Sequence, residues 1–267
     1  MSEFWSAIIL GIVEGLTEFL PVSSTGHMIL TGHLLGFTGE KAKTFEIVVQ
    51  LGAVLAVLVL YWRRFIGFLN FKESLNFRSR GKVNLFHMAL AMVPAVVVGL
   101  AIHSWVKEHL FGPATVLISL VVGGILIIIA DKSRIRITAE NMDDISYKQA
   151  FGIGLFQCLA LWPGFSRSGS TISGGMLLGA SQKAAAEFTF LVSVPVMFGA
   201  TGLDLYKSRD LLSMDDLGIF IAGLVVSFVV AMVAVVTFLN VIKRLSLSWF
   251  AYYRFVLAAV FYVILFL

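Results

Sequence analysis

Two short segments of this sequence carry chemically reactive side chains in surroundings that are otherwise apolar. The first, residues 14–27, holds two glutamates four positions apart, a cluster of hydroxyl groups and a histidine. The second, residues 162–171, holds one arginine among serines and a threonine. Ionisable groups at membrane depth cost roughly 2.5–3.5 kcal/mol each on insertion, so they are usually retained for function. Carboxylates, hydroxyls, an imidazole and a guanidinium together suit a site that binds and cleaves a phosphate ester or anhydride.

The acidic pair in the first segment is suited to binding a cation. Glu14 and Glu18 share one face of a helix, because residues four apart are neighbours there. Two like charges in a low-dielectric site repel each other unless a cation lies between them. The pair therefore fits a divalent metal with hard oxygen ligands, or a general base beside one metal ligand. A solvated helix face is the simpler alternative, but the flanking residues are apolar.

The hydroxyl cluster marks the start of a second helix. Ser23, Ser24 and Thr25 follow Pro21, and one of them is a natural N-cap. Capping cannot account for all three, and a helix start rich in hydroxyls is also an anion site. His27 lies three and four residues after the two serines, so its imidazole is expected to reach a hydroxyl on the same face. We interpret it as catalytic rather than as a buried structural histidine.

The second segment supplies the positive charge that the first lacks. Arg167 offers a permanently charged planar fork suited to bidentate phosphate contacts. The alternative is that it neutralises the glutamates, and both roles can hold together. We expect the first segment to bring base, nucleophile and acidic ligands, and the second to bring the clamp. The predicted phosphate-binding residues are Ser23, Thr25, Ser166, Arg167, Ser168 and Thr171.

The elements that position these residues are expected to be membrane helices. Only 13% of the residues are charged and 58% are hydrophobic, whereas a soluble domain has about 25% charged residues. The net charge of +4 is therefore assigned to membrane topology and lipid headgroups, and not to nucleic acid. The single cysteine, Cys158, rules out an intramolecular disulfide. Asp204 and Arg254 are expected to pair with each other or to extend to the interface.

Six apolar segments are each long enough to cross a membrane at 1.5 Å per residue. Two further segments, 4–36 and 151–179, are broken midway by Pro21 and by Pro163, and each half is too short to cross. Such breaks occur at membrane depth only where they line a cavity or pack within protein. We predict two re-entrant helix pairs whose tips carry the polar segments. The plain spans are predicted at 45–62, 85–105, 114–130, 188–206, 217–239 and 249–267.

The two broken segments align with each other at an offset of 143 residues, for example from Gly11 to Gly154. The same offset pairs Ser23 with Ser166. Each copy is followed by three plain spans, an odd number that places the halves in opposite orientations. The prediction is an all-α integral membrane protein with an inverted-topology repeat, whose site lies where the broken elements meet. Its parts are a first repeat (1–131), a cytoplasmic linker (132–149) and a second repeat (150–267), forming one integrated membrane domain.

The loops predict the orientation. Basic residues gather after the first plain span, in the linker and before the last span, and the opposite loops carry fewer. The positive-inside rule places the richer side in the cytoplasm. Both termini and the first re-entrant pair are then expected at the outer face. The cytoplasmic basic residues are Arg63, Arg64, Lys72, Arg78, Arg80, Lys82, Lys132, Arg134, Arg136, Lys148, Lys243 and Arg244.

The two polar segments resemble the signature motifs of the bacterial undecaprenyl-diphosphate phosphatase family, also known as bacitracin-resistance proteins. The motifs here read EGLTEFLPVSSTGH (14–27) and PGFSRSGST (163–171), and the similarity covers essentially the whole chain. The resemblance implies hydrolysis of undecaprenyl diphosphate to the monophosphate at the outer face of the bacterial plasma membrane. This reaction recycles the lipid carrier for cell-wall synthesis, and the resemblance also implies a divalent cation, Mg²⁺ or Ca²⁺. The family's functional residues correspond to Glu14, Glu18, Ser24, His27 and Arg167.

The motifs do not identify the group that attacks phosphorus. We expect Ser24 to be the nucleophile, with His27 and Glu18 assisting and Glu14 and Glu18 as metal ligands. Attack by His27 itself, or by water on a metal-bound diphosphate, is the alternative. Arg167 completes the expected catalytic set.

The competing class of function is a secondary transporter or flippase of a polyprenyl phosphate, because inverted repeats with broken helices are common among transporters. Phosphate release by the purified protein separates the two classes. The expected partners are a polyprenyl diphosphate lipid and the bilayer. A homodimer is compatible with the sequence, and no nucleic acid is expected.

Overall fold

The computed structural model describes residues 2–70, 74, 82–110, 112–208, 216–242 and 244–266. Lys72, Arg78, Arg80 and Lys243, which entered the topology prediction, lie outside these residues. The described part consists of α-helices and two short 3-10 helices joined by turns and loops. The helices are α1 (Glu3–Thr17), α2 (Ser24–Leu35), α3 (Glu40–Leu60), α4 (Trp62–Phe68), α6 (Leu85–His109), α7 (Pro113–Lys132), η1 (Met142–Asp144), α8 (Tyr147–Gln157), η2 (Cys158–Leu161), α9 (Arg167–Leu177), α10 (Gln182–Ser208), α11 (Leu217–Val241) and α12 (Ser248–Phe266).

All six predicted plain spans are long helices. Five of them, α6, α7, α10, α11 and α12, are each long and apolar enough to cross a membrane. The sixth, α3, meets the same condition together with α4, from which it is bent by 80°. The bend falls at Tyr61, two residues before Arg63 and three before Arg64. The prediction of an all-α, multi-pass membrane protein is confirmed.

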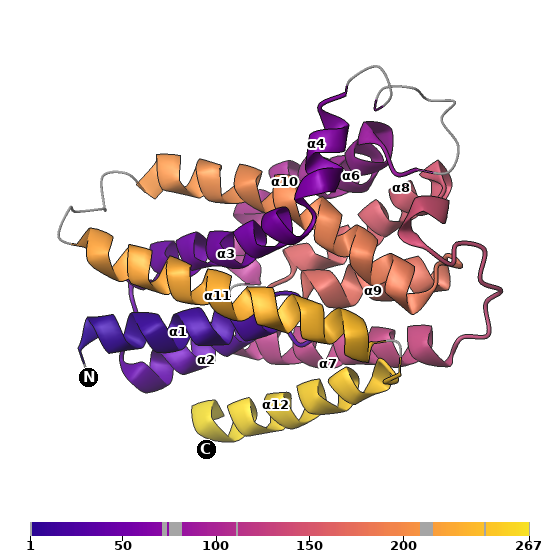
Figure 1. Cartoon of the computed structure of the whole chain (residues 1–267). Coiled ribbons are helices and arrows are strands. Elements are labelled where there is room, and N and C mark those ends of the chain that lie inside the picture. Colours follow the sequence, from indigo (N-terminus) through magenta and orange to yellow (C-terminus); the bar gives the residue numbers. More distant parts are fainter. Residues whose placement is uncertain are drawn as a thin grey trace.

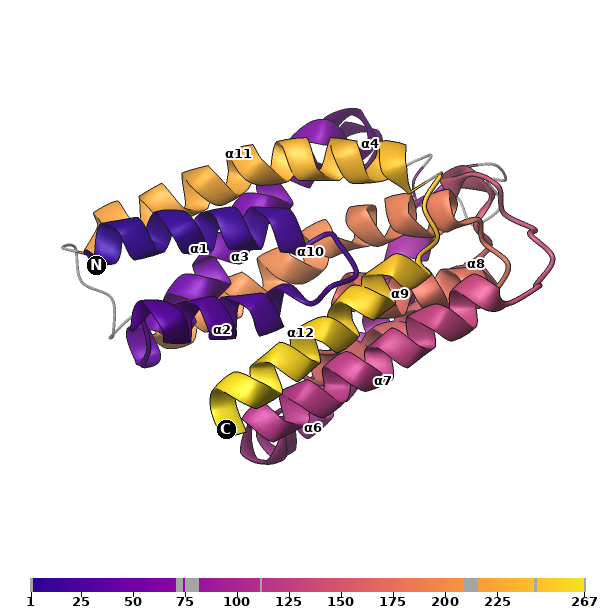
Figure 2. The same ribbon diagram turned by 90° about the horizontal axis from the view of Figure 1, so that it is seen from below.

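Both predicted breaks are present. The first pair is α1 and α2, of 15 and 12 residues, and the second is α8 and α9, of 11 residues each. None of these helices is long enough to cross a bilayer core of about 30 Å. Figure 1 shows α1 and α2 at the end of the molecule that carries both termini, whereas α8 starts and α9 finishes at the end that carries the linker. Figure 2 shows the same arrangement from below. The arrangement is consistent with an inverted repeat.

Each re-entrant pair packs against the opposite half of the chain. Helix α1 lies along α11, and α8 lies along α6. A Cβ atom at Gly11 would lie 2.7 Å from the carbonyl oxygen of Gly223, and one at Gly154 would lie 2.7 Å from that of Ala91. Only glycine permits backbones to approach so closely, as is common between membrane helices. The two glycines are equivalent in the internal alignment, so the repeat is visible in the packing.

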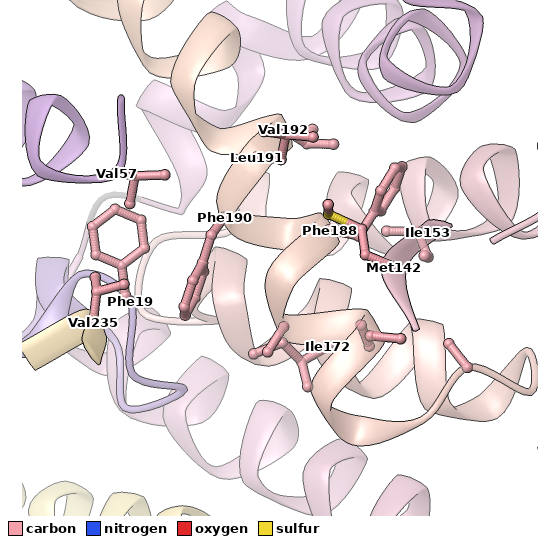
Figure 3. Packing of buried hydrophobic residues seen from close by; sticks show 14 of the residues in the cluster. Phe19, Val57, Met142, Ile153, Ile172, Phe188, Phe190, Leu191, Val192 and Val235 are labelled. Carbon is pink, nitrogen blue, oxygen red and sulfur yellow. The ribbon is translucent and has the colours of Figure 1, made fainter. Parts of the chain in front are cut away.

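The break in the first pair is fixed by Phe19. Its side chain is fully buried, and its ring lies 4.9 Å from that of Phe190 in an edge-to-face arrangement. Figure 3 shows Phe19 between Val57 and Val235, with Phe190 opposite. These neighbours belong to α3, α11 and α10, so the turn that carries the first polar segment is anchored on helices from both halves.

Candidate active site

Two strained serines mark the tips of the re-entrant pairs. Ser23 has φ 73° and Ser166 has φ 75°, and they are the only non-glycine residues with positive φ among those described. Each caps the helix that follows: Ser23 Oγ accepts the Gly26 amide at 3.3 Å and Ser166 Oγ accepts the Gly169 amide at 3.1 Å. Such a backbone conformation costs about 1–3 kcal/mol and clusters at functional sites. The two serines are equivalent in the internal alignment, so both copies form the same turn.

The two tips meet through one carboxylate. Ser24 Oγ donates to Glu18 Oε2 at 2.6 Å, and Arg167 Nη2 donates to Glu18 Oε1 at 2.9 Å. Glu18 is 7% exposed, so these contacts are shielded from solvent. The structure therefore brings a hydroxyl, a carboxylate and a guanidinium from the two polar segments into one cluster.

Glu14 lies one helical turn before Glu18 and is fully buried. Neither of its carboxylate oxygens has a hydrogen-bond partner in the part of the chain that the structure describes. The charges of Glu18, Glu46 and Arg167 act on it. A buried carboxyl group without a partner is costly, and a bound cation would satisfy it.

The donor set suits a metal that is shared with a substrate. Within the described residues, no group of three or more histidine, cysteine, aspartate or glutamate side chains is placed to hold a metal ion. Glu14 and Glu18 supply two hard carboxylate ligands, which is the number that Mg²⁺ usually takes from protein before phosphate and water complete its shell. The residues present fit a divalent cation of this kind.

Arg167 has donors to spare. Its Nη2 pairs with Glu18, but Nε and Nη1 have no hydrogen-bond partner within the described ranges. The side chain is 12% exposed and lines a cavity. One edge of the fork thus neutralises a glutamate, while Nε and Nη1 are buried donors without a partner in the described residues. Contact of these donors with a phosphate stays a prediction.

The cavity has a volume of about 620 Å³ and two chemically different ends. Its polar end includes Gln50 and Gln157, which sequence reasoning did not assign to the site. Its apolar end runs between α6 and α10, where Val96, Leu100 and Leu203 are also 46%, 72% and 45% exposed. The predicted site residues that line the polar end are Glu18, Ser23, Ser24, Thr25, Ser166 and Arg167.

His27 faces away from this cavity. Its Nδ1 lies 2.8 Å from the carbonyl oxygen of Ser23, and its Nε2 lies 2.6 Å from the hydroxyl of Tyr253 on α12. The two rings are parallel, with centroids 5.6 Å apart. A carbonyl oxygen only accepts, so the proton is assigned to Nδ1. We expected the imidazole to reach a hydroxyl of the serine pair; the structure gives it a serine carbonyl and a tyrosine instead.

Ser168 and Thr171 also lie behind the cavity wall. Ser168 Oγ donates to the carbonyl oxygen of Leu20 at 2.8 Å and thereby joins the second turn to the first. Thr171 Oγ1 donates to the carbonyl oxygen of Arg167 at 2.8 Å and accepts from Thr189 at 3.0 Å. Each is 1% exposed, and neither is among the residues that line the cavity. In this structure they fasten the turns.

Arg254 was not recognised as part of this region. Its expected partner, Asp204, has a side chain outside the described part of the structure. Arg254 does not extend to the interface: it is fully buried, and its guanidinium donates to carbonyl oxygens of α7 and of the second turn. An arginine within an apolar span itself indicates function. Its partners could not be predicted, because backbone carbonyl groups occur in every residue and cannot be identified from residue types.

Comparison with known proteins agrees with the geometry. Residues 7–260 match the family model described as bacitracin resistance protein BacA. The chain is 56% identical over 261 residues to proteins named undecaprenyl-diphosphatase 1 from Bacillus thuringiensis subsp. konkukian and from Bacillus anthracis. Each alignment covers 98% of this chain and 98% of the relative. The chain belongs to the bacitracin resistance protein BacA family.

Proposed function

We propose that this protein hydrolyses undecaprenyl diphosphate to undecaprenyl phosphate and inorganic phosphate. The observation that supports this most directly is the cavity, which joins the cluster of Ser24, Glu18 and Arg167 to an apolar passage between α6 and α10. A diphosphate head group fits the first end and an isoprenoid tail fits the second. The relatives named undecaprenyl-diphosphatase support the same substrate.

Ser24 is the proposed nucleophile. Its hydroxyl donates to Glu18 at 2.6 Å, so a proton acceptor is already in place. Attack on the terminal phosphorus forms a phosphoserine and breaks the bond to the bridging oxygen, which leaves with undecaprenyl phosphate. Water then attacks the phosphoserine: its hydroxyl stays on phosphorus, which leaves as inorganic phosphate, and its proton restores the Ser24 hydroxyl. Glu18 releases the proton that it took from Ser24 to the departing phosphate or to solvent. His27 has both ring nitrogens engaged elsewhere, which makes it the weaker candidate for either role.

Arg167 is the proposed phosphate clamp. Its Nε and Nη1 groups can donate to the non-bridging oxygens on which charge develops during transfer. Nη2 stays paired with Glu18, so this edge of the fork keeps the carboxylate in place while the clamp uses the other donors.

A divalent cation, Mg²⁺ or Ca²⁺, would be held by Glu14 and Glu18. When bound, it would neutralise part of the diphosphate charge. The orphaned oxygens of Glu14 support this assignment.

We further propose that the protein lies in the bacterial plasma membrane with the site open to the outer face. The basic residues of the linker, at the end opposite both termini, support this orientation. Hydrolysis there would return the lipid carrier to cell-wall synthesis and would confer bacitracin resistance. Association of two copies stays a prediction.

The test is phosphate release from undecaprenyl diphosphate by the purified protein in detergent with Mg²⁺ or Ca²⁺. We expect one phosphate and one undecaprenyl phosphate per substrate consumed, and no release after chelation. A flippase without hydrolytic activity would bind the lipid and release no phosphate. That outcome would contradict the proposal.

A further inference from the structure

Helix α12 contacts both strained turns through two neighbouring residues. Tyr253 reaches the first turn through His27, and Arg254 reaches the second turn directly. Neither residue belongs to the polar segments that carry the proposed chemistry. Each contact ends at a backbone carbonyl next to, or within, one of the two positive-φ serines.

On the first turn, the contact is a chain of two hydrogen bonds. The Tyr253 hydroxyl donates to His27 Nε2 at 2.6 Å, and His27 Nδ1 donates to the Ser23 carbonyl oxygen at 2.8 Å. The imidazole therefore acts as a rigid spacer between α12 and the strained serine that directly precedes Ser24. Nothing in this arrangement requires the histidine to exchange protons with a substrate.

On the second turn, Arg254 is fully buried and uses its whole guanidinium. Nη1 donates to Phe165 O at 2.9 Å and Nη2 to Gly164 O at 3.1 Å, the two residues that precede Ser166. Nε and Nη2 also donate to Leu120 O at 3.0 Å and Ser119 O at 3.1 Å on α7. The side chain thus links α12, α7 and the turn that presents Arg167.

The surroundings of Arg254 are shaped for it. A Cβ atom at Gly123 would lie 2.4 Å from Nη2, so α7 admits the guanidinium only because this residue is glycine. All four hydrogen bonds of Arg254 in the described residues go to carbonyls and none to a carboxylate. A buried cation held this way is a poor source of stability, because hydrophobic residues of similar volume usually do as well or better. We therefore attribute the presence of Arg254 to the elements that it holds together, α7, α12 and the second turn.

We propose that Tyr253 and Arg254 form an α12 brace, a positioning element that holds both strained turns so that Ser24 and Arg167 face Glu18. His27 is the positioning residue of its first arm and not a proton acceptor for Ser24. This proposal rests on the proposed function, because the brace is tested by measuring phosphate release. Strain of about 1–3 kcal/mol at each serine persists only where surrounding contacts determine the conformation, and the brace supplies such contacts to both.

The first arm is tested with Tyr253→Phe, which removes one hydroxyl. We expect kcat to fall about 3- to 10-fold, the value of one net hydrogen bond, with KM within about twofold because the tail passage is untouched. Tyr252→Phe is the matched control: the two tyrosines are adjacent and equally exposed, at 45% and 46%. Equal losses in both variants would overturn the first arm.

The role of His27 is tested with His27→Asn, whose amide can still donate to the Ser23 carbonyl from the position of Nδ1. A positioning role predicts a loss of about 10-fold or less and an unchanged shape of the kcat–pH profile. A general base or nucleophile at this position predicts a loss of about 10²–10⁴-fold. Adding Tyr253→Phe to His27→Asn should change kcat by less than about twofold, because the tyrosine acts through the histidine. A full additional loss would contradict the relay.

The second arm is tested with Arg254→Lys, which keeps the charge and loses the planar fork. We expect kcat to fall at least about 30-fold while KM changes little, and wild-type kcat would overturn this arm. Should the variant not fold, Arg254→Gln, which keeps an amide donor and loses both the charge and the fork, gives the second measurement with the same expectation. Absence of phosphate release by the wild-type protein would instead count against the proposed function. Active wild type with unaffected brace variants would count against the brace alone.

Discussion

The two tips of the re-entrant pairs have the same backbone and different chemistry. Ser23 and Ser166 adopt nearly the same positive φ and cap their helices with the same bond. The next residue is Ser24 in the first copy and Arg167 in the second. One scaffold therefore presents a nucleophile from one side and a cation from the other, and neither copy contains the whole site.

The copies also differ in the helix that leads to each tip. The first carries Glu14, whose carboxylate is buried without a hydrogen-bond partner in the described residues. The second carries Gln157 at the equivalent position, whose amide donates to the Ala91 carbonyl at 3.3 Å. The first copy thus carries a charged carboxylate that can hold a metal or a proton, while the second carries a neutral, hydrogen-bonded amide at that position. Division of labour between copies thus extends beyond the tips.

The largest expected effect comes from Ser24→Ala. Loss of the nucleophile should lower turnover by more than about 10³-fold, while folding and lipid binding persist. Rapid quenching of the wild-type reaction should trap phosphate on a hydroxyl, an acid-stable adduct. Ser173→Ala is the control, because this buried serine of α9 has no hydrogen-bond partner among described residues. An acid-labile adduct, or substantial turnover by Ser24→Ala, would assign the attack to another group.

The equivalent position in the second copy should come next. Arg167→Lys keeps the charge but loses the fork, and we expect turnover to fall by about 10²–10³-fold. Arg64→Lys is the control, because Arg64 pairs with Asp143 and does not line the cavity. Near-wild-type turnover in Arg167→Lys would remove the clamp role and leave only charge neutralisation.

Glu14→Gln makes the first copy resemble the second. We expect the cation concentration for half-maximal activity to rise by at least about 10- to 100-fold. The melting temperature should rise as well, because a buried carboxyl group without a partner is replaced by a neutral amide. A metal titration and a thermal melt measure the two effects. An unchanged titration would show that the acidic pair is not a metal site.

The smallest effects should separate the cavity wall from the residues behind it. Thr25 lines the cavity and Thr171 does not. Thr25→Val should raise KM by about 3- to 10-fold, the value of one hydrogen bond. Thr171→Val should leave turnover within about threefold but lower stability by about 1 kcal/mol, because Thr189 loses its acceptor. The reverse pattern would place Thr171 on the phosphate.

Much of this architecture could be read from the sequence. The apolar runs predicted the six spans. Pro21 and Pro163 predicted the breaks, because two helical halves that are each too short to cross are compatible with few structures at membrane depth other than a re-entrant pair. The 80° bend after α3 was not predicted, because a hydropathy pattern carries no angle.

Within the site, the meeting of Glu18 with Arg167 followed from the internal alignment. The orientation of His27 did not, because its partner Tyr253 lies 226 residues away and a tyrosine in a span has many ordinary explanations. Arg254 was visible as an unusual charge in an apolar segment, but its acceptors are carbonyls that every residue possesses.

The apolar end of the cavity also determines how the substrate reaches the site. Leu100 and Leu203 line the passage and are exposed on the surface between α6 and α10. A lipid entering there diffuses in two dimensions and never leaves its bilayer or micelle. Reaction rates then follow the mole fraction of substrate among amphiphiles, and not its molarity in the buffer. Adding detergent at constant total substrate should slow the reaction by dilution of that surface alone.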